Sequence, residues 1–172
     1  MAWHRKLEYA QLQSRGKGIA IRIGVISDTH GLLRPAALDA MRGSDLIVHA
    51  GDIGDPSILR ALAALAPVTA VRGNNDFGDW ADALRDVETI AAGGMRLGLV
   101  HDVKSLGAPH RALAWSAIVA GHSHRPLCEM RDGVMHFNPG SAGPRRFSLP
   151  VSCGEIVVEG GTLRGRIVTL AV

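Results

Sequence analysis

Residues 120–126, Ala-Gly-His-Ser-His-Arg-Pro, directly follow the short apolar run 117–120. Such a run is typical of a buried strand that ends in a loop. It places two imidazoles, His122 and His124, just beyond the predicted strand end. Neutral imidazole is the commonest metal ligand, and alternate side chains diverge from a shared backbone, so a His-x-His pair can serve two adjacent metal ions. Two polar loop residues near a turn are the alternative interpretation, and the rest of the chain has to decide.

The first half of the chain alternates predicted strands with predicted helices. Apolar, β-branched runs occupy 19–27, 46–50 and 68–71, and helical patterns occupy 35–42 and 56–66. Strands separated by helices predict parallel βαβ units. The second half predicts a hairpin over 89–92 and 96–100, a second hairpin over 127–131 and 134–137, and two further strands over 152–158 and 162–170. We therefore expect an α/β fold in which a parallel half and a mainly antiparallel half form two mixed sheets, packed face to face with helices outside.

Length and composition indicate one globular domain over residues 19–172, because 172 residues with 47% hydrophobic content can bury a single core. The net charge of +3 arises within residues 1–18, which we interpret as an N-terminal tail, an added start region or an extra helix. The remaining charges balance and aromatic residues make up only 4%, so we expect no specific binding of duplex nucleic acid. The two cysteines are far apart, and the sequence shows neither a signal-peptide pattern nor an apolar run long enough to span a membrane. We therefore expect a cytoplasmic protein.

Metal-competent side chains follow five successive predicted strands. Taken singly, each of them has an ordinary explanation as a turn or helix cap. In α/β sheets, however, sites form beyond the carboxyl ends of parallel strands, so residues far apart in sequence can converge there. The ordered set favours a metal site, and its members are Asp28, His30, Asp52, Asn74, His101, His122 and His124.

The motif series Asp28-x-His30, Gly51-Asp52, Gly73-Asn74, His101 and Gly121-His122-x-His124 resembles that of the calcineurin-like metallophosphoesterase superfamily. The small size is similar to its compact bacterial and archaeal phosphodiesterases, and Asn138-Pro139-Gly140-Ser141 is similar to a turn that they carry. The resemblance implies a four-layer α/β/β/α sandwich. It implies one metal held by Asp28, His30, Asp52 and His124, and a second held by Asp52, Asn74, His101 and His122.

The resemblance further implies that Asp52 bridges two divalent cations, which repel each other and need an anion between them. A hydroxide bridging the two ions would attack a phosphate ester in line, with Asp52, Asn74 and His101 as the expected catalytic residues. Nitrogen and oxygen ligands suit Mn, Ni, Fe, Co or Zn, among which we favour Mn. We expect a phosphodiesterase that acts on a small phosphate ester. A phosphomonoesterase is the nearer alternative, and an interaction scaffold similar to a retromer subunit of this fold is the other.

One position departs from the superfamily pattern. Many members carry a histidine that protonates the leaving group where this chain has Asn75, and an amide cannot act as a general acid at pH 7. Asn75, Arg72 and Arg125 are the candidate substrate-binding residues, since arginine favours phosphate, with surface ion pairing as the alternative for the two arginines. His49 is either a packed core residue or a support for the ligands. A homo-oligomer is a further expectation.

Overall fold

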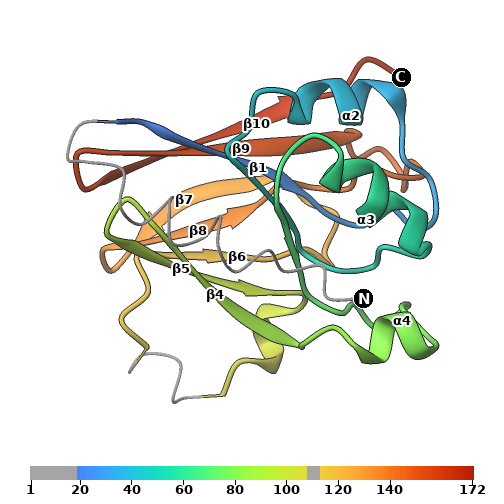
Figure 1. Cartoon of the computed structure of the whole chain (residues 1–172), viewed down its shortest axis with the longest axis horizontal. Coiled ribbons are helices and arrows are strands. Elements are labelled where there is room, and N and C mark those ends of the chain that lie inside the picture. Colours follow the sequence, from blue (N-terminus) through green and yellow to red (C-terminus); the bar gives the residue numbers. More distant parts are fainter. Residues whose placement is uncertain (1–18, 108–112) are drawn as a thin grey trace.

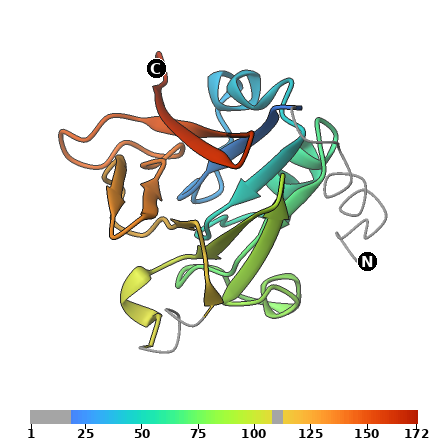
Figure 2. The ribbon, with the colours of Figure 1, turned by 90° about the vertical axis from the view of Figure 1, so that its left-hand side faces the viewer.

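Two five-stranded mixed sheets face each other in the computed structural model, which describes residues 19–107 and 113–172 (Figures 1 and 2). The predicted N-terminal extension, residues 1–18, lies outside the described residues. The first sheet has the order β10-β9-β1-β2-β3, with bounds Thr162–Thr169, Ser152–Glu159, Ile21–Ile26, Leu46–His49 and Val68–Ala70. The second has the order β4-β5-β6-β8-β7, with bounds Val87–Ala92, Met95–Val100, Ala117–Val119, Val134–Asn138 and Leu127–Arg131. The helices are α2 (Pro35–Met41), α3 (Pro56–Ala63), α4 (Asp79–Asp82) and the 3-10 helix η1 (Val103–Ser105).

The predicted fold class is confirmed, but strand pairing differs from the expectation of one parallel and one antiparallel half. Strands β1, β2 and β3 are parallel as predicted, and the C-terminal hairpin β9–β10 joins this sheet antiparallel to β1. In the second sheet β5, β6 and β8 are parallel to one another. Turn signals reveal which neighbours form hairpins, whereas pairing across long connections depends on tertiary packing. Both sheets therefore have parallel strands at their centre.

The main core fills the space between the sheets. Alternate residues of β1, Ile21, Ile23 and Val25, are fully buried there and pack with side chains of the second sheet such as Leu99 and Phe137. This alternation follows from the two-residue period of a strand. Full burial of one such side chain stabilises the fold by roughly 1.5–3 kcal/mol, so the facing surfaces hold the sheets together.

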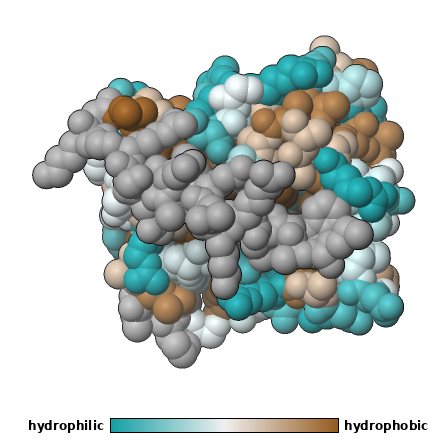
Figure 3. Space-filling view, viewed as in Figure 1, coloured by the Kyte–Doolittle hydropathy of each residue, from teal (hydrophilic) through white to brown (hydrophobic). Residues whose placement is uncertain are grey.

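Helices α2 and α3 cover the outer face of the first sheet (Figure 1). Helix α3 begins at Pro56 and is capped by Asp55, whose carboxylate accepts a hydrogen bond from the Ser57 N–H at 2.7 Å. Its buried face packs against Ile47 of β2. The surface seen in Figure 3 mixes hydrophobic and hydrophilic residues. Within the described ranges, every helix is too short or too polar to cross a membrane.

We expect Phe137→Ala to lower the free energy of unfolding by about 3–5 kcal/mol, because it opens a cavity between the sheets where Phe137 is 1% exposed. Met130 on the neighbouring strand β7 is 60% exposed and provides the control. Met130→Ala should change the unfolding free energy by about 0.5 kcal/mol or less. Denaturant titration measures both, and similar values for the two variants would contradict this description of the core.

Candidate metal centre

Loops at the carboxyl ends of the central strands bring the metal-competent residues together. The loops after β1 and β2 continue the parallel pairing beyond the strands, because the Asp28 N–H donates to the Gly51 carbonyl at 3.0 Å and the His30 N–H to the Asp52 carbonyl at 2.9 Å. In the second sheet, the Gly121 N–H donates to the His101 carbonyl at 3.0 Å. The backbone thus fixes these loops before any side-chain contact is considered.

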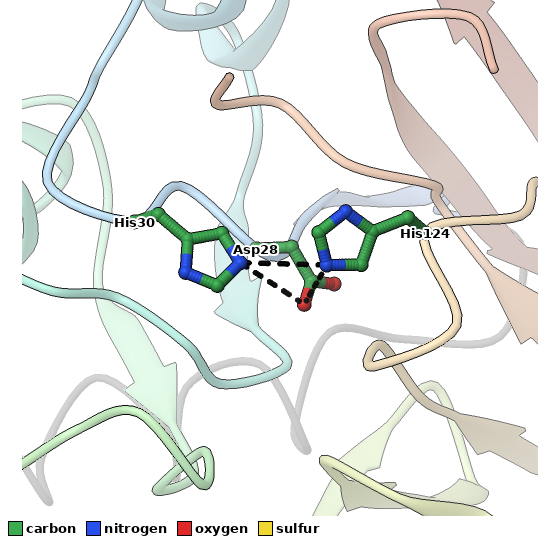
Figure 4. A group of neighbouring side chains, drawn as sticks. All are labelled: Asp28, His30 and His124. Carbon is green, nitrogen blue, oxygen red and sulfur yellow. Dashed lines mark hydrogen bonds and ion pairs between the residues drawn. The ribbon is translucent and has the colours of Figure 1, made fainter. Parts of the chain in front are cut away.

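A first cluster consists of Asp28, His30 and His124 (Figure 4). His124 Nε2 lies 3.2 Å from Asp28 Oδ1 and 3.4 Å from His30 Nε2. The distance from His30 Nε2 to Asp28 Oδ1 is 4.0 Å. Two ring nitrogens and one carboxylate oxygen therefore point to a common centre.

The two oxygens of Asp28 have different surroundings. Oδ2 accepts hydrogen bonds from the Ser27 hydroxyl at 2.7 Å and from the His122 N–H at 3.1 Å. Oδ1, which faces the two histidines, is buried and accepts no hydrogen bond. A buried carboxylate oxygen without a donor is costly, and a cation at the centre of the cluster would satisfy it.

A second cluster consists of Asn74, His101 and His122. Asn74 Oδ1 lies 3.0 Å from His101 Nε2 and 3.0 Å from His122 Nδ1, and these two nitrogens are 3.3 Å apart. His101 Nδ1 lies 2.7 Å from the Ala50 carbonyl, to which it donates, so in the neutral ring Nε2 is an acceptor. Two acceptors 3.0 Å apart need a proton or a cation between them.

Asp52 lies between the clusters and is 2% exposed. Its Oδ2 is 3.7 Å from His30 Nε2, and its Oδ1 is 3.5 Å from His101 Nε2. Asn75 donates to both oxygens, from its backbone N–H to Oδ1 at 2.8 Å and from its side-chain amide to Oδ2 at 2.6 Å. Burial alone would raise the pKa of Asp52, but the interaction with the nearby His101 ring and the two hydrogen bonds from Asn75 outweigh burial and lower it. The residue between the two clusters is therefore a carboxylate anion.

The spacing of the donor atoms fits divalent metal ions. Ligand atoms at about 2.1 Å from one ion lie roughly 3–3.5 Å apart in tetrahedral or octahedral geometry. The distances within the two clusters are close to this range, and the carboxylate between them can serve both. Imidazole nitrogens with carboxylate and amide oxygens suit first-row divalent ions.

The pKa values of two histidines shift in opposite directions. Burial lowers the pKa of His30, despite the opposing charges of Asp52 and Asp28, so its ring is neutral at pH 7. Burial would also lower the pKa of His101, but the hydrogen bonds to Asp52 and to the Ala50 carbonyl outweigh burial and raise it. A metal that binds His101 therefore competes with a proton, so metal affinity depends on pH.

Five of the candidate ligands have left-handed backbone, with φ of 53° at Asp28, 46° at His30, 54° at Asp52, 66° at His122 and 57° at His124. Such conformations are uncommon outside glycine, and aspartate and histidine are among the residues that adopt them most often. Backbone strain of this kind persists where the surroundings fix the chain, and it concentrates at functional sites. This concentration carries no sequence signal beyond the residue types.

Glycine is required next to two of the ligands. A Cβ at Gly73 would overlap the backbone nitrogen of Asp52, and a Cβ at Gly121 would overlap the Ser27 hydroxyl. The turn at 138–141 braces the histidine loop, because the Asn138 amide donates to the Gly121 carbonyl at 2.7 Å. The Ser141 hydroxyl donates to the Asp28 carbonyl at 2.9 Å. The turn thus ties the loops of the two sheets together.

All seven sequence-predicted ligands lie at this edge, and their roles as ligands stay predictions. Of the candidate substrate-binding residues, Asn75 contacts Asp52. Arg72 is turned toward two carboxylates, 3.3 Å from Asp82 Oδ1 and 2.9 Å from Asp86 Oδ1. Arg125 is exposed and lines a second cavity of about 430 Å³, which His122 also lines.

Buried polar side chains support the loops that carry the candidate ligands, and the sequence already suggested this role for Asp76 in the loop of Asn74. Asp76 is buried, and its carboxylate accepts hydrogen bonds from the Gly54 N–H and the Gly73 N–H, both at 2.8 Å, which links the loops after β2 and β3. Ser27, which donates to Asp28, was not singled out, and only its place at a strand end could have indicated it.

His49 is fully buried on β2. Its Nε2 lies 3.0 Å from Thr29 Oγ1, whose hydroxyl donates to the Ile53 carbonyl at 2.9 Å, so His49 Nε2–H is the donor to Thr29. Thr29 lies between the candidate ligands Asp28 and His30. His49 is therefore both a core residue and a support of the first cluster. Burial lowers its pKa to about 3, so the ring is neutral.

Comparison with known proteins gives consistent results. Residues 21–160 match the model of the calcineurin-like phosphoesterase superfamily domain. A probable metallophosphoesterase of Methanothermobacter thermautotrophicus is 34% identical over 160 residues, which cover 85% of this chain and 91% of the relative. The solved structure of an archaeal phosphodiesterase covers 86% of this chain and 100% of its own, with 21% identity and a TM-score of 0.70. The structure of Vps29 from Entamoeba histolytica, solved with zinc, covers 87% of this chain and 99% of its own, with 22% identity and a TM-score of 0.65. The two structures show the shared fold.

We expect His49→Gln to change the pH dependence of stability. In the unfolded chain His49 has a pKa near 6.5, whereas in the native state its pKa is about 3. As the pH falls from 6.5 toward 3, the unfolded state binds a proton that the native state does not bind, so this residue lowers the free energy of unfolding. The cost is about 1.4 kcal/mol per pH unit. Glutamine cannot titrate but can still donate to Thr29. The difference in unfolding free energy between wild type and variant, both metal-free, should therefore shift by about 2–3 kcal/mol in favour of the variant from pH 6.5 to 4.5. Denaturant titrations at the two pH values measure it, and parallel pH profiles would refute the assignment.

Proposed function

This chain belongs to the calcineurin-like phosphoesterase superfamily, and from that premise we propose that it is a phosphodiesterase with a binuclear metal centre. The observation that carries the proposal is the pair of clusters that share Asp52. One metal would be held by Asp28, His30, Asp52 and His124, and the other by Asp52, Asn74, His101 and His122. We favour Mn among the ions that suit these ligands.

Bound divalent ions would supply Lewis acidity toward the phosphoryl oxygens and lower the pKa of a coordinated water. The chain's own contribution is to hold the ligands. Asn75 keeps the Asp52 carboxylate oriented through two hydrogen bonds. The Ala50 carbonyl keeps the proton of His101 on Nδ1 and leaves Nε2 available.

A diester is supported by the room beside the site. A cleft with a volume of about 800 Å³ adjoins Asn74, His101 and His122, and it can receive a second organic group that a monoester lacks. The similarity to a solved archaeal phosphodiesterase points the same way. A cytoplasmic location, a small phosphate-ester substrate and a homo-oligomeric state stay predictions from the sequence.

A non-catalytic scaffold is the rival from another class, because proteins of vacuolar sorting share this fold. Vps29 from Entamoeba histolytica has been solved with zinc, so metal binding alone does not separate the two functions. What favours an enzyme here is the accessible cleft next to the second cluster, since a structural metal site needs no such opening. Hydrolysis must therefore be measured directly.

With Mn²⁺, we expect a higher kcat/KM for ethyl p-nitrophenyl phosphate than for p-nitrophenyl phosphate, which has the same leaving group. Asp52→Asn should reduce kcat/KM at least 100-fold and lower the bound metal, because an amide cannot bridge two cations as an anion. Steady-state assays and elemental analysis measure the two effects. Asp39→Asn, at an exposed position of α2, is the matched control.

Three results would count against the proposal. An unchanged rate of hydrolysis in the Asp52→Asn variant would contradict the proposed role of Asp52 as the ligand shared by both metals. A preference for the monoester would replace the phosphodiesterase by a phosphomonoesterase. A metal-loaded protein that hydrolyses neither ester would favour the scaffold.

The contact between Asn75 and Asp52 predicts a strong dependence on the leaving group. Because Asn75 cannot donate a proton to the leaving oxygen at pH 7, ethyl aryl phosphates should react more slowly as the pKa of the phenol rises, and alkyl leaving groups should be slower by about 10²–10⁴-fold. Asn75→Ala should lower kcat/KM by about tenfold across the series through loss of a hydrogen bond to a carboxylate. The slope of log kcat/KM against phenol pKa should stay the same. A steeper slope in the variant would instead mean that Asn75 assists the leaving group.

A further inference from the structure

The cleft beside the second cluster has an acidic lining. Its inner end is formed by the candidate ligands Asn74, His101 and His122, and its walls include carboxylates of Asp82, Asp86 and Asp102. Asp82 and Asp86 expose 70% and 71% of their side chains, so they are available to a bound group. Asp102 Oδ2 lies 3.8 Å from His122 Nε2, which places this carboxylate next to the cluster.

The positive charge in the cleft is already paired. Arg72 is the one arginine or lysine among the described residues that line it, and its guanidinium contacts both Asp82 and Asp86. Asp76 also lines the cleft, but its two oxygens accept backbone hydrogen bonds. Three carboxylates against one cation leave the walls net negative. The carboxylates on these walls favour a cationic group over a second phosphate or a carboxylate.

An exposed aromatic ring completes the cleft. Phe77 is 74% exposed and lines it together with Val87. Carboxylates around an exposed aromatic face suit a positively charged organic group, which gains both ion pairing and cation–π attraction. A neutral group of the same shape gains only the apolar contact.

We propose that this cleft binds one of the two alcohol groups of the phosphodiester substrate. The cleft prefers an alcohol group that carries a positive charge, for example a quaternary ammonium. Asp82, Asp86 and Phe77 are then specificity-determining residues. The inference rests on the proposed phosphodiesterase function and narrows its substrate class from any diester to diesters of cationic alcohols. It also explains the orientation of Arg72, which is held by the acidic wall and is therefore not free to bind a second anion.

The test uses three p-nitrophenyl diesters that differ only in the second alcohol. Choline is cationic, 3,3-dimethylbutanol is its neutral isostere, and 4-hydroxybutanoate is anionic. For the Mn²⁺-loaded protein at low ionic strength, we expect kcat/KM to fall about fivefold from the choline ester to the neutral ester, and about fivefold again to the anionic ester. At about 0.5 M NaCl the ratios should move toward one, because salt screens exposed charges.

Two variants separate the charge of the cleft from the charge of the whole protein. The double variant Asp82→Asn with Asp86→Asn leaves Arg72 unpaired, so the preference for the choline ester over the neutral ester should fall below about twofold. Asp39→Asn, an exposed change on α2, should keep the wild-type ratio. Phe77→Leu keeps an apolar wall without the π face and should lower the ratio about twofold.

The outcomes distinguish this inference from the function on which it rests. Hydrolysis of all three esters at equal rates by the wild type would overturn the charge selection and leave the phosphodiesterase function standing. Hydrolysis of none of them by the metal-loaded protein would contradict both. A wild-type ratio that persists in high salt and in the double variant would place the selection elsewhere and overturn the assignment to this cleft.

Discussion

The buried carboxylate of Asp52 is the constraint around which the candidate site is arranged. An anion that is 2% exposed needs compensation, and it receives two hydrogen bonds from Asn75 and two nearby imidazoles, His30 and His101. These partners come from different loops, so the charge holds the ends of the two sheets in one geometry. Cations in the adjoining clusters would complete the compensation, which is why a metal centre suits this position.

The remaining ligands are held by backbone rather than by their own side chains. Left-handed conformations at four of them, and at Asp52 itself, cost free energy. The continued strand pairing, the bracing turn at 138–141 and the buried carboxylate of Asp76 fix these conformations nevertheless. Fully buried His49 supports the loop between Asp28 and His30 in the same way. The strain and the buried polar groups are understandable if the loops serve a site, since a stable fold alone would not need them.

The surroundings of the site are electrically uneven, and this shapes the proposed function. The clusters bring together carboxylates and imidazoles that suit divalent cations. The adjoining cleft has net negative walls, because its one arginine, Arg72, is paired with Asp82 and Asp86. Asn75, whose amide cannot protonate a leaving group at pH 7, donates a hydrogen bond to Asp52. A diester with a good leaving group and a second, non-anionic ester group matches both features. A dianionic monoester lacks the second ester group that the acidic cleft would receive.

The sequence by itself determined the strands, the helices α2 and α3 and a set of candidate ligands. Apolar, β-branched runs indicated the strands, and polar residues that follow five of them indicated the candidate site, because strand ends are local features that short motifs record. The sequence could not determine that β9 pairs with β1, that β5, β6 and β8 run parallel, or that Asn75 contacts Asp52. Those relations join residues far apart in the chain, and only tertiary packing brings them within hydrogen-bonding distance. The charge of the cleft was likewise decided in three dimensions, since Arg72 suggests a phosphate site in sequence and becomes part of an acidic wall once Asp82 and Asp86 fold beside it.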